Sequence, residues 1–190
     1  MKNLSTVLNG EITALKESIA SFIFPSHCIH CDEKIESRKF LCSSCADQLE
    51  FIDATGVRKS ATLEPLGSAL SFRQAAKGPL AEEVAKTISA YMVIQWQRLK
   101  WPLPDIIIPS PKDPFNLLLS KHLSIFLGVS TLQALKFSGF FSPRYQWKAT
   151  PYLSDQRLLV IDILMPDLKE LAILEEACPK EIFYLSLLDL

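Results

Sequence analysis

The sequence predicts an α/β protein built on a parallel β-sheet, with a helix and a small cysteine-rich module in front of it. Two observations predict the sheet. Three short, continuous apolar runs have the composition of strands buried on both faces: "DIIIPSP", "QRLLVIDIL" and "EIFYLSLL". Helical patterns alternate with these runs, which is typical of a parallel sheet. The third observation, four cysteines within residues 28–45, indicates the separate module.

Composition and charge set limits on the class of protein. The chain has 190 residues, of which 48% are hydrophobic, enough for one ordinary domain and a small extra module. Twenty Lys and Arg against 21 Asp and Glu give a net charge of -1. This balance provides no global attraction to nucleic acid or to an anionic membrane. No stretch approaches the roughly 18 apolar residues that a membrane span requires.

Residues 1–25 are predicted to form an amphipathic helix. Their apolar residues recur every three or four positions: Leu4, Leu8, Ile12, Leu15, Ile19 and Phe22. Glu11, Lys16 and Glu17 interrupt the apolar core that a secretory signal would need. We therefore expect a cytoplasmic protein, and disulfides are uncommon in that compartment.

Residues 26–52 are predicted to form a zinc ribbon. Two Cys-x-x-Cys pairs, Cys28/Cys31 and Cys42/Cys45, supply the four thiolates that structural Zn²⁺ prefers. The alternatives are two redox pairs or a disulfide scaffold. His27 and His30 flank the first pair, but four cysteines already close the site, so we expect neither histidine to bind the metal. A closed site stabilises the fold and does not catalyse.

The remaining chain is divided into a linker and the α/β domain. Residues 53–68 mix Gly, Pro, Ser and Thr and are predicted to be a linker, which leaves residues 69–190 for the domain. Helices are expected near 80–99, 114–127 and 167–177. The last should bury a stripe that includes Leu168, Leu171, Ala172 and Leu174. Cys178, just beyond it, is expected to be a buried apolar residue.

The order of four segments resembles the ComF family: "FIFPSHCIHC", a long helix, "DIIIPSP" and "RLLVID". The resemblance implies a four-cysteine ribbon joined to a type I phosphoribosyltransferase-like domain, with a link to competence and DNA uptake. It also implies site residues. Asp162 matches the first acid of a pair that binds ribose hydroxyls or Mg²⁺, Lys112 would contact pyrophosphate, and Asn116 survives from the loop motif.

The sequence departs from that family where phosphate should bind. In the family, an acidic pair leads into a Thr-Thr-Gly turn whose hydroxyl and N–H groups hold the 5′-phosphate. Here Ile163 replaces the second acid, Pro166 has no N–H to donate, and Asp167 adds a negative charge. Leu168 stands where the turn requires glycine.

The loop that would bind pyrophosphate also lacks most of the residues that the family has there. Lys112 is the only cation in "IIPSPKDPFNLLLSKHL" before the helix, and the family's Arg-Gly and Gln are absent.

Two of the candidate residues have simpler explanations. Asp162 could be a strand-end carboxylate that caps the following turn, and Asn116 could be a helix N-cap. Trp96, Trp101 and Trp147 are expected to serve packing rather than base stacking.

Two functions remain from these observations. The first is a non-catalytic accessory or interaction protein with a degenerate phosphoribosyltransferase-like domain, and the substituted phosphate turn favours it. The alternative is an active phosphoribosyltransferase that uses phosphoribosyl pyrophosphate and Mg²⁺. The expected partner is a protein, and family resemblance suggests the DNA-uptake machinery. Nucleic acid contact stays open, because a few cations could form a small basic face: Lys34, Arg38, Lys39, Arg58 and Lys59.

Overall fold

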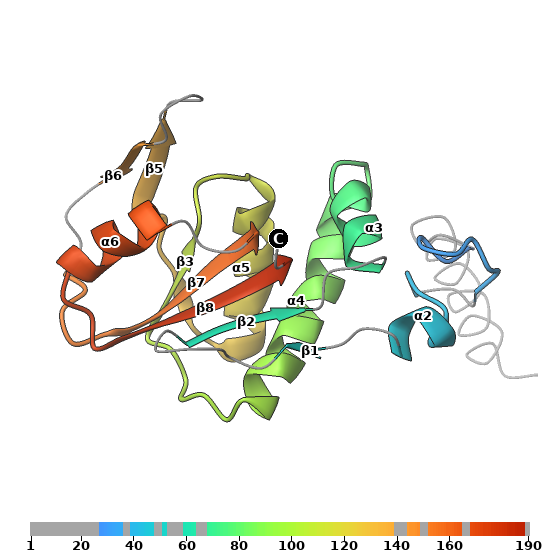
Figure 1. Ribbon diagram of the computed structural model, residues 1–190, viewed down its shortest axis with the longest axis horizontal. Coiled ribbons are helices and arrows are strands. Elements are labelled where there is room, and N and C mark those ends of the chain that lie inside the picture. The colour runs from blue at the N-terminus through green and yellow to red at the C-terminus, as the bar shows by residue number, and fades with distance from the viewer. Residues whose placement is uncertain are drawn as a thin grey trace, which may run out of the picture. The chain divides into compact units, whose positions relative to one another are not determined.

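A computed structural model describes most of the chain, as two compact units (Figure 1). The described residues are 27–35, 39–47, 51–52, 59–63, 68–138, 144–148, 152–164 and 168–188. The units are Met1–Gln48 and Leu49–Leu190, and we describe each by itself. The predicted N-terminal helix over 1–25 lies outside the described residues, as do turn residues 165–167.

The first unit contains the cysteine module. Its described part has a β-bridge between His27 and Lys34 and one short helix, α2 (Ser43–Asp47). Phe40 and Leu41 are buried between the two cysteine pairs.

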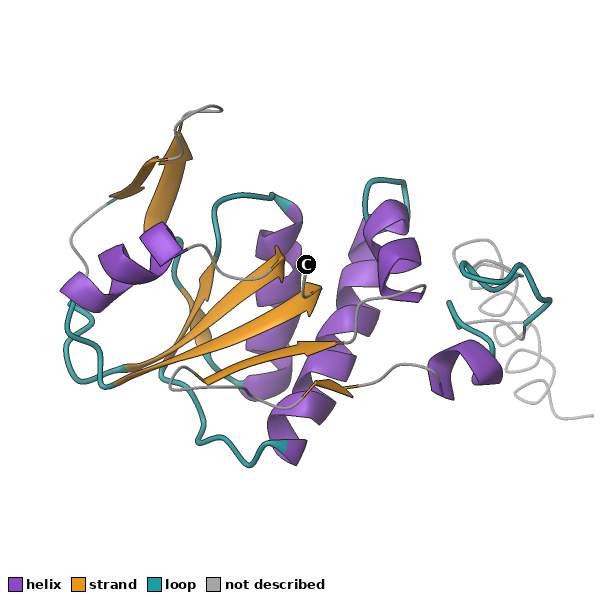
Figure 2. Ribbon diagram, viewed as in Figure 1, coloured by secondary structure: helices purple, strands orange, loops and turns teal. Residues whose placement is uncertain are grey.

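The second unit is organised around a six-stranded sheet in the described part of the chain, in the order β1-β2-β8-β7-β3-β4 (Figure 2). The strands are β1 (Phe51–Ile52), β2 (Lys59–Leu63), β3 (Ile106–Pro109), β4 (Ser130–Thr131), β7 (Arg157–Leu164) and β8 (Glu181–Leu188). Only the β1–β2 pair is antiparallel; every other pair in this sheet is parallel. The prediction that the three apolar runs form one parallel sheet is confirmed.

Strand β7 lies at the centre of the sheet. Leu159 stands opposite Ile107 of β3 on one side and opposite Phe183 of β8 on the other. The strand is buried from Leu158 to Ile163, because helices cover both faces. Six consecutive buried residues explain why its sequence is a continuous apolar run with one carboxylate.

The helices divide between the two faces of the sheet (Figure 1). The described helices of this unit are α3 (Ser68–Ala75), α4 (Ala81–Arg98), α5 (Phe115–Leu127) and α6 (Leu168–Glu176). Helices α4 and α5 pack against each other on one face. The rings of Trp96 and Trp101 lie 5.2 Å and 5.1 Å from Phe183 on this side, so both tryptophans serve packing, as predicted.

Helix α6 covers the opposite face. Leu171 and Leu174 pack with Leu158, Val160 and Tyr184. The alternation of side chains along β7 then places Asp162 on the same face as Leu158 and Val160. Two short antiparallel strands, β5 (Leu135–Ser138) and β6 (Arg144–Trp147), form a separate hairpin beside this layer, and Trp147 packs against the same apolar cluster.

Three expectations require correction. The predicted linker contains β2, whose residues Lys59–Leu63 pair in parallel with β8; "KSATL" has too few apolar residues to be recognised as a strand. Cys178 is exposed rather than buried, in a left-handed conformation with φ 49°. The stripe of α6 is also different, because Leu168 and Ala172 are exposed while Glu170 is buried.

Among the described helices, none has the length and apolar character needed to cross a membrane.

Candidate metal centre and polar site

The first cysteine pair stands on a tight turn. The amide of Asp32 donates to the carbonyl of Cys28 at 3.0 Å, and the Cys28 amide donates to the Glu33 carbonyl at 2.7 Å. Asp32 has φ 62°, a left-handed conformation usually taken by glycine and tolerated by aspartate. This explains how the turn closes without glycine, so that both sulfurs can face one centre.

The second pair stands at the start of α2. The Cys45 amide lies 3.4 Å from the Sγ atom of Cys42 and donates to it. The Ile29 amide donates to the Phe40 carbonyl at 3.0 Å and joins the segments that carry the two pairs. The chain therefore brings the two turns together through its backbone.

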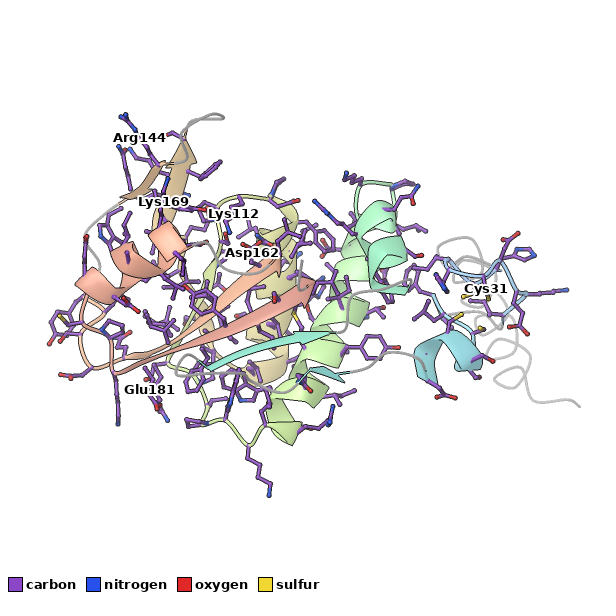
Figure 3. The ribbon with its side chains drawn as sticks, in the orientation of Figure 1. Cys31, Lys112, Arg144, Asp162, Lys169 and Glu181 are labelled. Atoms are coloured by element: carbon purple, nitrogen blue, oxygen red, sulfur yellow. The ribbon has the colours of Figure 1, made fainter. Side chains whose placement is uncertain are left out.

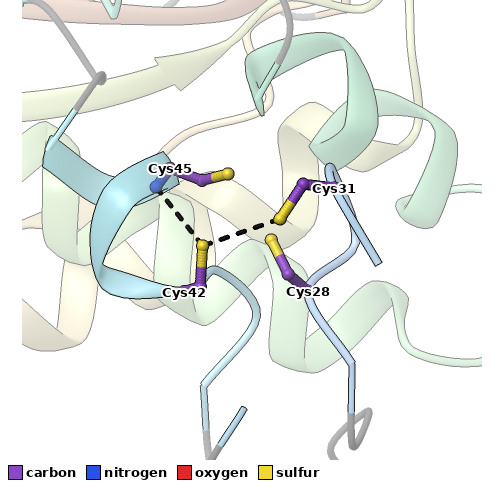
Figure 4. A group of neighbouring side chains, drawn as sticks. All are labelled: Cys28, Cys31, Cys42 and Cys45. Atoms are coloured by element: carbon purple, nitrogen blue, oxygen red, sulfur yellow. Dashed lines mark hydrogen bonds between the residues drawn. The ribbon is translucent and has the colours of Figure 1, made fainter. Parts of the chain in front are cut away.

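The four sulfur atoms form a set that fits Zn²⁺ (Figure 4). All four Sγ atoms, from Cys28, Cys31, Cys42 and Cys45, lie within 4.8 Å of one another. The Cys31 and Cys42 sulfurs are 3.7 Å apart. Tetrahedral coordination with Zn–S bonds of about 2.3 Å needs sulfurs about 3.8 Å apart. His27 and His30 are exposed and outside this set.

The surroundings of Cys28 and Cys45 shift the pKa values of these two thiols in opposite directions. Burial raises the pKa of the Cys28 thiol, but the amides of Cys31, Cys42 and His30 outweigh it and bring the pKa down to about 6. Burial and the neighbouring thiols raise the pKa of Cys45. Bound Zn²⁺ would stabilise all four thiolates together. With four protein ligands the site leaves no position for water, so its role is structural.

A second polar site lies at the carboxyl ends of β3 and β7. The connection from β3 through α5 leads to β4 at one edge of the sheet, and the connection from β7 through α6 leads to β8 on the other side. Adjacent parallel strands whose connections diverge in this way leave a crevice at their carboxyl ends, where open α/β sheets bind ligands.

The three predicted site residues of this domain meet at these strand ends. The Lys112 Nζ atom lies 2.9 Å from Oδ2 of Asp162 (Figure 3). Asn116 donates through Nδ2 to Oδ1 of Asp162 at 3.1 Å, and the Leu164 amide donates to the same oxygen at 3.3 Å. Both oxygens of the buried Asp162 carboxylate are therefore engaged by the protein itself.

The Leu164 amide that donates to Asp162 belongs to the last residue of β7. The turn of the capping alternative lies outside the described residues, so that alternative stays a prediction. The N-cap alternative for Asn116 is wrong. Pro114 occupies the cap of α5, and the Phe115 amide donates to Oδ1 of Asp113 at 2.8 Å. Asn116 lies inside the helix, fully buried, and also donates to the Ser110 carbonyl at 3.1 Å.

Two further residues complete the cluster and were not predicted. Ser110 donates through Oγ to Oε2 of Glu170 at 3.0 Å, and Lys112 Nζ lies 3.5 Å from that same oxygen. Glu170 has no exposed surface. The sequence did contain an indication of this. Glu170 stands four residues before Leu174, and this spacing places its charged side chain on the buried face of α6.

Glu170 is held in an environment that disfavours its charged form. Burial raises its pKa to about 7; Lys112 opposes this rise and the Asp162 carboxylate adds to it. The cluster thus combines one ammonium group, one engaged carboxylate and one carboxyl group that titrates near neutral pH.

A cavity of about 330 Å³ opens beside the cluster and shares Ser110 with it. It lies between the start of α5 and the β5–β6 hairpin, with a mixed lining: Pro109, Pro111, Asp113, Pro114, Leu117, Gln133, Leu135, Lys136, Phe137 and Lys148. Of its two lysines, Lys148 donates to Gln133 at 2.9 Å. The volume is at the lower limit for a small-molecule site.

The cluster as it stands does not fit Mg²⁺. An ammonium group lies within 2.9 Å and 3.5 Å of the two carboxylates that would have to hold the ion. The second acid expected from the family resemblance is replaced by Ile163, which is buried. A divalent cation would have to displace Lys112 before it could reach either oxygen.

Comparison with known proteins supports the assignment of the cysteine module as a zinc ribbon. Residues 19–62 match the Double zinc ribbon domain family. Together with the sulfur geometry, this shows an N-terminal four-cysteine zinc-binding ribbon in front of a parallel-sheet α/β domain. Comparison with curated protein sequences finds no match.

Among solved structures, the chain is similar to phosphoribosyltransferases. The purine phosphoribosyltransferase from Pyrococcus horikoshii is 19% identical, with a TM-score of 0.41 over 54% of this chain and 82% of that one. The adenine phosphoribosyltransferase from Saccharomyces cerevisiae is 11% identical, with a TM-score of 0.43 over 77% and 87% of the two chains. At such identities and TM-scores, these similarities carry no argument about what this chain binds.

Proposed function

We propose that this chain is a ComF-like zinc-ribbon protein whose phosphoribosyltransferase-like domain is non-catalytic and serves as an accessory or interaction module. By the same resemblance, we propose a cytoplasmic role linked to competence and DNA uptake, with a protein as its partner. A reducing compartment fits a ribbon that needs four free thiolates.

The ion pair between Lys112 and Asp162 carries the proposal. In the family, the carboxylate at Asp162 would bind ribose hydroxyls or a hydrated metal ion. Here its Oδ2 atom lies 2.9 Å from Lys112, and its Oδ1 atom accepts hydrogen bonds from Asn116 and Leu164. A substrate would have to break charge-assisted hydrogen bonds that are worth about 1.5–3 kcal/mol each.

The charge of the cluster also opposes an anionic ligand. Lys112 is the cation that would hold pyrophosphate, and two carboxyl groups, Asp162 and Glu170, already surround its ammonium. Departure of pyrophosphate from the ribose carbon depends on positive charge around this leaving group. Within the described cluster no surplus of positive charge exists.

The turn after β7 supports the same conclusion through its sequence. Pro166 offers no N–H group, and Asp167 adds a negative charge where the resemblance places a phosphate. If three charge-assisted contacts are lost, a ligand that binds at about 1 μM would bind weaker than about 1 mM.

Titration calorimetry with phosphoribosyl pyrophosphate and Mg²⁺ tests the proposal. The natural chain is expected to bind it at millimolar concentrations or not at all. A restored variant with Ile163→Asp, Pro166→Thr, Asp167→Thr and Leu168→Gly should gain affinity if the rest of the crevice persists. Micromolar, Mg²⁺-dependent binding to the natural chain would contradict the proposal and favour the alternative, an active phosphoribosyltransferase.

A further inference from the structure

We infer that the cavity beside the β5–β6 hairpin is a docking site for an acidic, extended segment of a partner protein. This segment would pair with the outer edge of β5 and place an apolar side chain in the cavity. The inference rests on the proposed function in one respect, because that function supplies the protein partner. The strand edge, the charge of the hairpin and the lining of the cavity carry the rest.

The cavity lies along the edge of β5. Three consecutive residues of this strand line it: Leu135, Lys136 and Phe137. Side chains alternate between the two faces of a strand, so three successive residues line one cavity where that cavity borders the strand's edge. In the described part of the chain, β5 pairs with β6 alone, which leaves its other edge without a strand partner. Such an edge can receive a further strand from another chain.

The hairpin presents a basic face. Four exposed side chains share this face: Lys136, Ser138, Arg144 and Gln146. They form two directly opposed pairs in the register of β5 and β6, and opposed residues lie on the same side of a sheet. Arg144 extends away from the domain (Figure 3). Lys148, which follows β6, is also exposed and lines the cavity together with Lys136.

No negative charge in the neighbouring sequence offsets these cations. Between residues 113 and 155 the chain has no aspartate or glutamate, while it has Lys121, Lys136, Arg144 and Lys148. Among the described residues, Lys121 pairs with Glu82, whereas the other three form no ion pair. A local surplus of positive charge, in a chain whose net charge is -1, favours a negatively charged partner segment.

The cavity also has an apolar part. Leu117 and Phe137 contribute side chains that are 40% and 38% exposed. Three prolines of the β3–α5 loop line the cavity as well: Pro109, Pro111 and Pro114. The carboxylate in the lining, Asp113, belongs to this loop and accepts a hydrogen bond from the Phe115 amide. An apolar side chain of the segment would therefore face the loop, and its acidic residues would face the hairpin.

Nucleic acid fits these residues less well. Stacking of successive bases requires a row of exposed aromatic rings. In the described part of the hairpin Phe137 is exposed, but Tyr145 is buried, with its ring 5.2 Å from that of Phe137. Trp147 packs against the apolar cluster under α6. The hairpin thus combines its cations with an apolar cavity and a free strand edge, which is a combination suited to a peptide.

Fluorescence anisotropy with the full-length, zinc-loaded protein tests the inference. The probe is a labelled peptide in which aspartates flank a single leucine. Lys136→Glu is expected to weaken its binding about tenfold or more, because a facing charge is reversed. Methylation of the peptide's backbone nitrogens at the leucine and at the next residue should also weaken binding. Methylated amides cannot donate hydrogen bonds to a strand edge.

Lys77→Glu is the matched control. Lys77 is exposed and outside both the hairpin and the cavity lining, so the same change of charge there should leave binding unchanged. The inference is overturned if the peptide does not bind, if the two charge reversals weaken it equally, or if the methylated peptide binds as tightly. Tighter binding of a single-stranded oligonucleotide of equal charge, lost in Lys136→Glu, would also overturn it. Calorimetry with phosphoribosyl pyrophosphate measures the proposed function separately, so a failure of peptide binding leaves that function standing.

Discussion

At the scale of single residues, Glu170 contributes a pH dependence to the stability of the α/β domain. The pKa of its carboxyl group rises from 4.5 to about 7 in the folded protein, mainly through burial. The folded state therefore holds this proton more tightly than the unfolded state does. Between pH 4.5 and 7 the unfolded chain binds fewer protons at this group, so the free energy of unfolding falls as pH rises.

The substitution Glu170→Gln should remove this fall in the free energy of unfolding with rising pH. A neutral amide can still accept the hydrogen bond from Ser110 and carries no charge to bury. We expect the variant to be more stable than the natural protein at pH 8, by up to about 3 kcal/mol, and similar to it at pH 4.5. Urea unfolding at the two pH values measures this difference. Glu176→Gln, at an exposed position of the same helix, is the control and should change stability at neither pH. An equal effect of Glu170→Gln at both pH values would contradict the assignment.

At the scale of elements, α6 shows which side chains hold a helix on the sheet. Leu174 has no exposed surface and packs with Leu158, Val160 and Tyr184, whereas Leu168 is 72% exposed. Leu174→Ala is expected to lower the free energy of unfolding by about 2–5 kcal/mol, because it leaves a cavity in this cluster. Leu168→Ala should cost less than about 0.5 kcal/mol. Denaturant unfolding of the two variants compares them directly, and equal losses would contradict the packing described.

The same helix shows what sequence periodicity can and cannot predict. Continuous apolar runs such as Ile106–Ile108 and Leu158–Ile161 favour strands covered on both faces, because they are short, rich in β-branched residues and, for the first, flanked by prolines. The observed stripe of α6 differs from the predicted one because Leu168, the first residue of the helix, is exposed, and because a glutamate on the buried face contradicts the usual pattern. The spacing to Leu174 places Glu170 on the buried face, but its membership of the polar cluster follows only from its contacts with Ser110 and Lys112.

Strand β2 and the polar site show a second limit of prediction from the sequence. "KSATL" carries no strand signal of its own; its position follows from pairing with β8, which is a long-range contact. Asp162, Lys112 and Asn116 were predicted as candidates from a family resemblance, and the structure brings them together. Their mutual bonds could not be predicted, because a resemblance specifies which residues occur and not whether they engage one another. The roles assigned to them stay predictions.

At the scale of the whole molecule, the two units draw stability from different sources. In the described part of Met1–Gln48 few apolar residues are buried, and the four clustered sulfurs could bind a metal ion whose binding would stabilise this unit. In Leu49–Leu190 the sheet and its helices bury a continuous apolar core. All three tryptophans, Trp96, Trp101 and Trp147, belong to the second unit, so their fluorescence reports on that unit alone.

This distribution predicts that losing zinc and unfolding the α/β domain are separate events. Cys42→Ser should lose most of its bound zinc, measured by metal analysis, because three thiolates leave the tetrahedral set incomplete. The urea midpoint from tryptophan fluorescence should match that of the natural protein. Cys178→Ser is the control, since Cys178 is exposed and outside the sulfur cluster, and it should keep one zinc per chain. Full zinc retention by Cys42→Ser would contradict the four-cysteine site, whereas a lowered fluorescence midpoint would show that the ribbon stabilises the α/β domain.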